Sequence, residues 1–155
     1  MKITDIEAIV LRQPAIDATI ADGSQDDLLV RIHTDEGLTG VGEVDSAPEA
    51  VRAFIEGADS HANAVSLRDM LIGSDPTRPE EVWRKLYSGS KMTGRRGALI
   101  CAMGAIDVAL WDIKAQALGV PSSSHIGLPS ACPRRSQSAM SIPLSAWMPR
   151  PRRAK

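Results

Sequence analysis

Residues 97–121 have the sequence GALICAMGAIDVALWDIKAQALGVP, and this stretch decides the fold. Drawn as a helix, it is apolar on every face, and only Asp107, Asp112 and Lys114 are charged. Three charges spread through the apolar run argue against a membrane span. A water-soluble helix that is apolar on all faces must be covered on all faces. We therefore predict a buried helix over 97–118 that packs against the segments before it and against something more on its other side.

Three stretches ahead of this helix are dense in Ile, Val and Leu at the alternating spacing of half-buried strands. They are Ile3–Leu11, Leu28–His33 and Leu38–Val44. Asp35–Gly37 supplies a tight turn between the second and third stretches, because glycine accepts a positive φ. Gly40 and Gly42 leave room for another backbone close to the third strand. The pattern predicts an antiparallel three-stranded meander.

Shorter helices are predicted between the strands and the long helix. Ser46–Glu49 has capping-box spacing, a hydroxyl followed three residues later by Glu, and predicts a helix that runs to about Glu56. A second helix is predicted over 61–72, and Thr77–Glu80 repeats the capping-box spacing at the start of a third. The predicted fold class is α+β, with the meander followed by a helical bundle.

The charge of the chain changes abruptly at Pro121. Residues 1–121 carry 12 basic and 19 acidic side chains, whereas 122–155 carry six basic and none acidic, together with eight Ser and five Pro. We predict a folded domain over 1–121 and an irregular basic tail over 122–155. Two cysteines do not make a disulfide framework, and the N-terminus is not a signal peptide, so a cytoplasmic protein is expected.

The run from Ala102 to Pro121 closely resembles the signature of the mandelate racemase / muconate lactonizing enzymes, a branch of the enolase superfamily. The opening MKITDIE, the DDLLVRIHTDEGLTGVGEV hairpin at 26–44 and Thr93–Gly97 resemble the same family in the same order. The resemblance covers about residues 1–121. It implies an α+β N-terminal capping domain, which in the family precedes a modified TIM barrel.

The resemblance also implies a chemistry. Family enzymes abstract the proton α to a carboxylate, using Mg²⁺ held by three barrel carboxylates and a barrel Lys or His as the base. No residue of this sequence matches a catalytic or metal-binding position, so neither role is assigned here. The ancestor implied is a Mg²⁺-dependent sugar-acid (aldonate or aldarate) dehydratase, a lyase, with isomerases among its relatives. Its partners would be a small-molecule carboxylate substrate and further copies of itself, with no nucleic acid and no membrane.

Two loops of the capping domain normally close over the substrate in this family. By position they correspond to Gln13–Gly23 and to about Asp45–Pro48. The candidate substrate-facing residues are Ile16, Asp17, Asp22, Asp45 and Ser46. Solvation alone also explains polar loop residues, and helix capping alone explains Ser46.

The resemblance stops at Pro121. The family pattern continues with an aliphatic residue and a Leu-Leu-Gly-Gly-like turn, but Ser122–His125 follows here. We expect a frameshifted or truncated product, inactive alone, whose barrel is missing or made as a separate chain. The alternative is a non-catalytic binding or assembly module whose basic tail contacts nucleic acid through phosphates.

Overall fold

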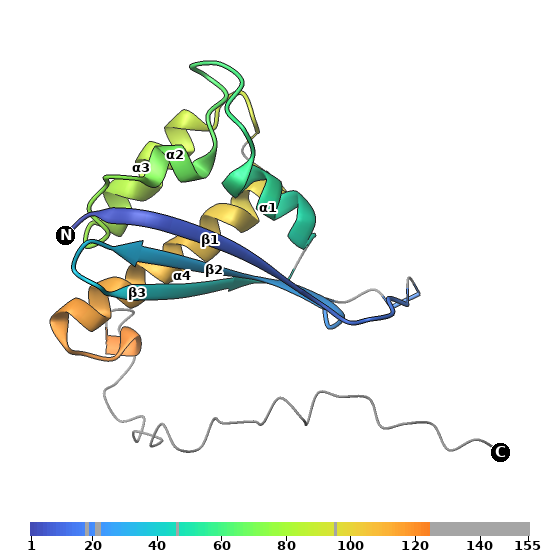
Figure 1. Ribbon diagram of the computed structural model, residues 1–155, viewed down its shortest axis with the longest axis horizontal. Coiled ribbons are helices and arrows are strands. Elements are labelled where there is room, and N and C mark those ends of the chain that lie inside the picture. The colour runs from blue at the N-terminus through green and yellow to red at the C-terminus, as the bar shows by residue number, and fades with distance from the viewer. Residues whose placement is uncertain (18, 21–22, 46, 95, 125–155) are drawn as a thin grey trace.

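The computed structural model describes residues 1–17, 19–20, 23–45, 47–94 and 96–124. Three strands come first, and four helices and a short 3₁₀ turn follow (Figure 1). In chain order they are β1 (Ile3–Arg12), β2 (Asp26–Thr34), β3 (Thr39–Val44), α1 (Pro48–Glu56), α2 (Leu67–Leu71), α3 (Pro79–Gly89), α4 (Ala98–Leu118) and η1 (Ser122–Ser124). The predicted α+β class and its order, meander before helices, are confirmed. Most of the predicted basic tail, 125–155, lies outside the described residues.

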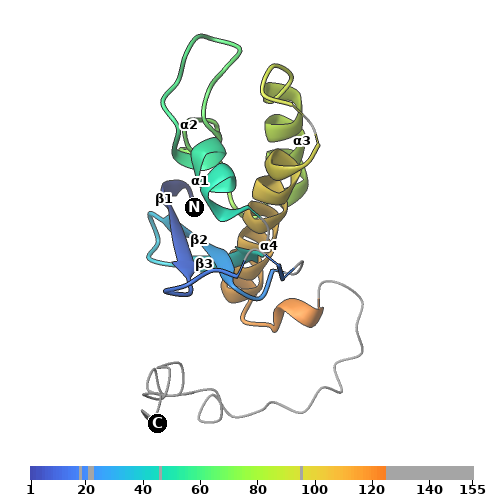
Figure 2. The ribbon, with the colours of Figure 1, turned by 90° about the vertical axis from the view of Figure 1, so that its right-hand side faces the viewer.

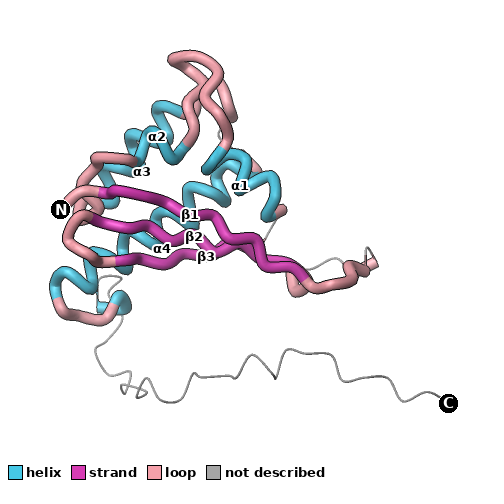
Figure 3. Tube along the Cα trace, in the orientation of Figure 1, coloured by secondary structure: helices cyan, strands magenta, loops and turns pink. Residues whose placement is uncertain are grey.

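The sheet is an antiparallel meander in the order β1-β2-β3. Ile6 pairs with Ile32, and Val30 pairs with Gly42, so apolar side chains from neighbouring strands share one face. Gly37 has a φ of 80° in the turn between β2 and β3, as predicted from its position. The helices all lie on that apolar face (Figure 2), and the tube in Figure 3 shows the three strands side by side with α4 behind them.

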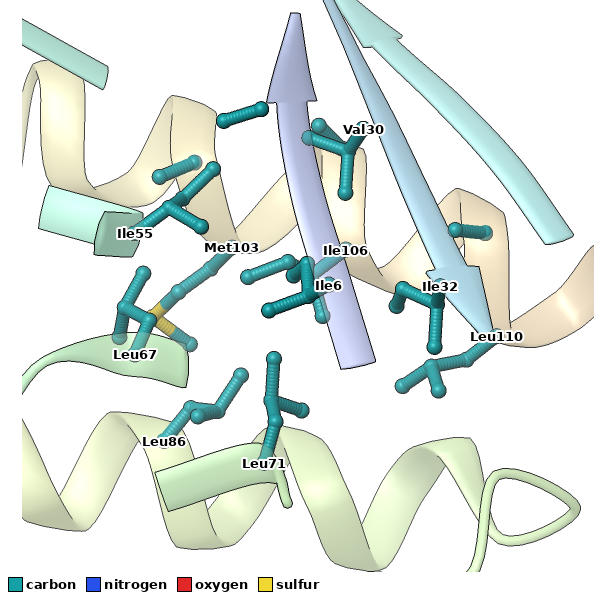
Figure 4. Packing of buried hydrophobic residues seen from close by; sticks show 14 of the residues in the cluster. Ile6, Val30, Ile32, Ile55, Leu67, Leu71, Leu86, Met103, Ile106 and Leu110 are labelled. Atoms are coloured by element: carbon teal, nitrogen blue, oxygen red, sulfur yellow. The ribbon is translucent and has the colours of Figure 1, made fainter. Parts of the chain in front are cut away.

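The core lies between the sheet and the helices (Figure 4). Ile6 and Ile32 point from the sheet toward α4, where Met103, Ile106 and Leu110 meet them. Leu67 and Leu71 of α2 and Leu86 of α3 close the cluster from the other side. Full burial of side chains of this size stabilises the fold by about 1.5–3 kcal/mol each.

Two glycines of β3 let the strand lie directly on α4. A Cβ added at Gly40 would lie 2.1 Å from the carbonyl oxygen of Ala109, and one added at Gly42 would lie 1.9 Å from that of Ala105. No side chain fits at such distances. The predicted close approach of another backbone is therefore confirmed, and the second backbone is that of the long helix.

Side chains from the helices also satisfy both outer edges of the sheet. The Asp112 carboxylate of α4 accepts a hydrogen bond from the Val41 amide (3.1 Å), and the Gln116 Nε2 donates to the Thr39 carbonyl (2.8 Å). On β1, the Ala8 amide donates to Glu56 of α1 (3.0 Å). Exposed strand edges invite pairing with other chains, so these contacts protect the sheet from it.

The described part of the chain covers α4 incompletely. The sheet, α1 and α3 bury most of its apolar residues. Val108 and Leu118 nevertheless remain 55% and 59% exposed. The preceding elements thus cover one side of α4, as predicted, and the predicted further cover on its other side is not among the described residues. None of the helices described is long and apolar enough to cross a membrane.

The predicted helix starts were partly wrong. Helix α1 begins at Pro48 with Ala47 as its N-cap, in a left-handed conformation (φ 50°) and with no side-chain cap, while Ser46 lies outside the described residues. Helix α3 has Arg78 as its N-cap, because the Thr77 hydroxyl donates to Asp75 instead (2.7 Å). Threonine side chains readily bond to neighbouring groups, which competes with capping.

The predicted helix over 61–72 is much shorter in the structure. It occupies only Leu67–Leu71, and Ser66 caps it by accepting a hydrogen bond from the Asp69 amide (3.1 Å). The preceding residues form a tight turn, in which the Ala64 amide donates to the His61 carbonyl (2.7 Å). The Asp59 carboxylate accepts from the Ser66 amide (2.7 Å), which holds this turn against the helix start.

Candidate functional site

The topology of the meander brings the two predicted substrate-facing loops together. In an antiparallel sheet, the end of β1, the start of β2 and the end of β3 lie at the same end. The loop 13–25 connects β1 to β2, and the segment 45–47 connects β3 to α1 (Figure 1). We call these two segments together the loop pair. It lies at the end of the sheet away from the turn at Gly37.

A glycine allows direct contact between the two segments. A Cβ added at Gly23 would lie 2.5 Å from the carbonyl oxygen of Asp45 and 2.9 Å from its Cβ. The backbone of the first loop therefore rests on Asp45 with no room for a side chain between them. Asp45 itself is exposed to solvent.

Hydrogen bonds close the loop 13–25 on itself. The Gln13 amide donates to the Gln25 carbonyl (2.9 Å), which continues the pairing of β1 with β2 by one step. The Gln13 side chain donates to the Ser24 carbonyl (3.2 Å). At the base of the loop, Arg12 and Asp26 form an ion pair of 3.2 Å. The two ends of the loop are thus held together where the sheet stops.

The Asp17 carboxylate is engaged within its own loop. Its Oδ1 accepts hydrogen bonds from the Thr19 amide (2.9 Å) and the Thr19 hydroxyl (2.6 Å). These bonds favour the charged form and hold the pKa of Asp17 below its usual value. Asp17 is therefore an ionised turn residue, a local role that accounts for its side chain.

Two apolar residues of this loop are largely exposed to solvent. Ile16 is 48% exposed and Ile20 is 45% exposed. The Ile20 amide donates to the Asp17 carbonyl (3.1 Å), so the two isoleucines flank one tight turn. Exposed isoleucines at a loop are available to contact a ligand or another part of a larger protein.

The structure places three of the five candidates that were predicted to face a substrate. Ile16 and Asp17 lie in the loop that contacts Asp45, so these three belong to the loop pair. Asp22 and Ser46 lie outside the described residues. Whether any of the five contacts a substrate stays a prediction.

Sequence reasoning missed the two residues that shape the loop pair. Gln25 is buried, although it sits in a polar loop, and its side chain bonds to Asp17 eight residues earlier. Gly23 was interpreted only as a loop glycine, not as a contact with Asp45. The sequence shows only that Gln25 is a polar residue just before a strand. This pattern does not indicate which distant residue its side chain binds.

The described residues do not fit a Mg²⁺ site. They contain no group of three or more His, Cys, Asp or Glu side chains placed to hold a metal ion. Mg²⁺ needs several oxygen ligands in near-octahedral geometry. In the loop pair, Asp17 already accepts two hydrogen bonds from Thr19. No step of a reaction is assigned to a metal held by these residues.

A depression lies between α3 and α4, away from the loop pair. Its volume is about 300 Å³, and its lining residues are Glu80, Trp83, Arg84, Asp107 and Trp111. Burial raises the pKa of Asp107, and the nearby Glu80 charge raises it further, while a hydrogen bond with Trp111 opposes the shift. Trp111 is thus a local partner of the Asp107 carboxyl group.

Residues 3–127 match the family model described as "Mandelate racemase / muconate lactonizing enzyme, N-terminal domain". The chain is 37% identical over 102 residues to a D-galactonate dehydratase of Pectobacterium atrosepticum, a match that covers 64% of this chain and 24% of the relative. The chain spans about a quarter of the length of the curated relatives it matches.

Solved structures share the fold at similar identity. The 3,6-anhydro-D-galactonate cycloisomerase of Zobellia galactanivorans superposes with a TM-score of 0.67 at 30% identity, over 82% of this chain and 32% of that one. An enolase of Agrobacterium radiobacter with bound sodium and L-malate gives a TM-score of 0.64 at 27% identity, over 82% and 28% of the two chains.

Proposed function

Because the chain belongs to the mandelate racemase / muconate lactonizing enzyme family through its match to the N-terminal domain, we propose that residues 1–121 are the substrate-capping part of a sugar-acid dehydratase. The reaction is removal of water from an aldonate or aldarate, begun by abstraction of the proton α to the carboxylate. In this proposal the base and the Mg²⁺ ligands come from a barrel domain, and this chain contributes recognition only.

The contact between the two loops carries the proposal. Gly23 rests on Asp45, which lies 22 positions later in the chain, so the two segments meet at one end of the sheet. The first segment of the loop pair carries the exposed Ile16 and Ile20, and the second carries the exposed residue Asp45. A small polyol acid has C–H faces, which can pack against isoleucine, and hydroxyl groups, which can donate hydrogen bonds to a carboxylate.

The substrate class is supported by the relatives. The curated relatives that resemble the chain include D-galactonate dehydratases, at 35–39% identity over about 100 residues. Among the similar structures, one enolase holds L-malate, and a structure from Bordetella bronchiseptica is complexed with 2-oxoglutarate/phosphate. D-galactonate, L-malate and 2-oxoglutarate are all small carboxylates. We therefore propose a hydroxylated carboxylate as the ligand that the loop pair faces.

A domain exchange tests the proposal. The N-terminal domain of the Pectobacterium atrosepticum D-galactonate dehydratase is replaced by residues 1–124 of this chain, and the chimera is assayed with Mg²⁺ against a panel of aldonates and aldarates. We expect turnover of at least one sugar acid, with a preference that differs from that of the parent enzyme. The parent enzyme and its barrel without any N-terminal domain are the controls.

Two results would overturn the proposal. One is a folded chimera that binds Mg²⁺ and turns over no member of the panel. The other is sugar-acid dehydration by the 155-residue chain alone, because this would place the catalytic groups within it. Nucleic-acid binding that is lost with residues 122–155, together with an inactive chimera, would favour the binding-module alternative.

A further inference from the structure

Gln25 is an unusual residue for its place in the chain. It lies at the end of a polar loop whose neighbours Gln13, Asp17 and Ser24 are exposed, yet Gln25 is buried. A buried amide side chain is costly unless its donors and acceptor are hydrogen-bonded. The partners of Gln25 therefore explain why this side chain is turned inward.

The side chain of Gln25 makes two hydrogen bonds to one residue. Its Oε1 accepts from the Asp17 amide (2.7 Å), and its Nε2 donates to the Asp17 carbonyl (3.0 Å). This is the pairing that a neighbouring strand would provide, supplied here by an amide side chain. Because Asp17 offers one donor and one acceptor, a carboxylate or an alkyl chain in place of the amide satisfies at most one of them.

The backbone of Gln25 is hydrogen-bonded at the end of the sheet. Its carbonyl accepts from the Gln13 amide (2.9 Å), and the next residue, Asp26, is the first of β2. Gln25 therefore links the rigid end of the β1–β2 pair to the middle of the loop. Two residues earlier, Gly23 rests on Asp45, so the same short segment also meets the second loop.

We propose that Gln25 is the positioning residue of the loop pair: its side chain holds the turn at Asp17, which Ile16 and Ile20 flank, to the segment whose Gly23 rests on Asp45. The backbone of Asp17 is bound by Gln25 and its carboxylate accepts hydrogen bonds from Thr19, so the exposed apolar side chains that flank this turn are Ile16 and Ile20. The role of Gln25 in substrate recognition rests on the proposed function, whereas its hydrogen bonds to Asp17 do not depend on that function.

Hydrogen exchange of the 155-residue chain, followed by NMR, tests the hold on the loop. In Gln25→Ala the Asp17 amide loses its acceptor, and its exchange should become about tenfold faster. The Ile32 amide in the centre of the sheet should exchange at the same rate in both proteins. Gln116→Ala is the matched control, because it removes an amide side chain that donates to the Thr39 carbonyl at the other end of the sheet, and it should leave the Asp17 amide protected.

A conservative variant keeps the test decisive if Gln25→Ala does not fold. Gln25→Glu retains an acceptor for the Asp17 amide and loses the donor to its carbonyl, so Asp17 protection should be partly kept. An Asp17 amide whose exchange is the same in wild type, Gln25→Ala and Gln25→Glu overturns the proposal. Equal acceleration of the Asp17 and Ile32 amides also overturns it, because that pattern indicates global destabilisation.

Kinetics of the chimera separate the two proposals. Gln25→Ala in the chimera should raise KM for the sugar acid about tenfold and change kcat less than twofold, because a mispositioned loop weakens recognition and leaves the barrel chemistry intact. Gln116→Ala, which lies outside the loop pair, should change neither. If the exchange result holds and the chimera turns over no sugar acid, the proposed function fails and the positioning role of Gln25 stands.

Discussion

Replacing Gly42 by alanine tests whether β3 and α4 are in backbone contact. The added Cβ would lie 1.9 Å from the Ala105 carbonyl oxygen, 2.8 Å from its carbonyl carbon and 3.1 Å from the Ala109 amide nitrogen. An ordinary contact at this carbonyl oxygen is about 1.5 Å longer, so the strand and the helix must separate. All three atoms belong to the backbone of α4, and no side-chain rotation can relieve the clash.

Two effects of opposite sign determine the size of the change. Alanine in place of a strand glycine restricts the unfolded chain and would by itself stabilise the protein by roughly 0.5–1 kcal/mol. Overpacking of a well-packed interface costs about 1–3 kcal/mol and sometimes more. Since the clash is with backbone, we place the cost at the upper end. The net expectation is a free energy of unfolding lower by about 2 kcal/mol.

Gly104 provides the matched control. It lies within the same helix, and a Cβ added there meets nothing within 4 Å. Gly104→Ala should raise the free energy of unfolding by about 0.5–1 kcal/mol, because glycine is a poor helix former. The same substitution should thus change the free energy of unfolding in opposite directions at Gly42, inside the contact between β3 and α4, and at Gly104, outside it.

Urea unfolding of the full chain, followed by the circular dichroism signal of the helices at about 222 nm, measures the free energy of unfolding of both variants. With a slope of about 1–3 kcal/mol per molar urea, Gly42→Ala should lower the midpoint by about 1 M. If Gly42→Ala alone is too unstable to purify, it is measured in the Gly104→Ala background. A Gly42→Ala variant as stable as wild type would refute the close contact of β3 with α4.

Three further predictions concern single hydrogen bonds and one titration. Asp112→Ala should lower the free energy of unfolding by about 1 kcal/mol, because the Val41 amide at the sheet edge loses its acceptor, whereas Asp112→Asn should cost less. Asp107→Asn should raise the free energy of unfolding at pH 7, because burial raises the pKa of Asp107 and its charged form disfavours folding. This stabilisation should vanish below about pH 3.9, the ordinary pKa of aspartate, because the carboxyl group is then protonated in both the folded and the unfolded chain. Stabilisation that persists at that pH would contradict this reasoning. Ser66→Ala should cost about 1 kcal/mol in urea unfolding, because the Asp69 amide loses its cap, and Ser66→Thr should restore most of it.

The predictions that held rest on local patterns. Alternation of apolar residues over 3–11 and 28–33 is enough to predict strands, because successive side chains point to opposite faces. Gly37 marks its turn through the positive φ that other residues avoid. The apolar run over 97–118 is too long and too uniform to be anything but a helix in contact with a core. Each signal lies within the segment it describes.

The predictions that failed concern competition between nearby partners. The Thr77 hydroxyl has two possible partners, the helix start and Asp75, and it donates to Asp75. The 61–66 segment has helix-compatible residues, but Asp59 binds the Ser66 amide and a turn precedes the helix. Such choices differ by about the energy of one hydrogen bond, and spacing in the sequence does not rank them.

The sequence by itself determined the α+β class, the order of the elements and the membership of the family, because periodicity, turn residues and the Ala102–Pro121 signature are all local properties. Only the tertiary structure decided how the loop pair is built. Gln25 reaches back to Asp17, and Gly23 rests on Asp45, through contacts that exist only once the three strands align. A hydrogen bond or a close approach between distant residues leaves no periodic trace in a chain, and it is the folding of the sheet that creates it.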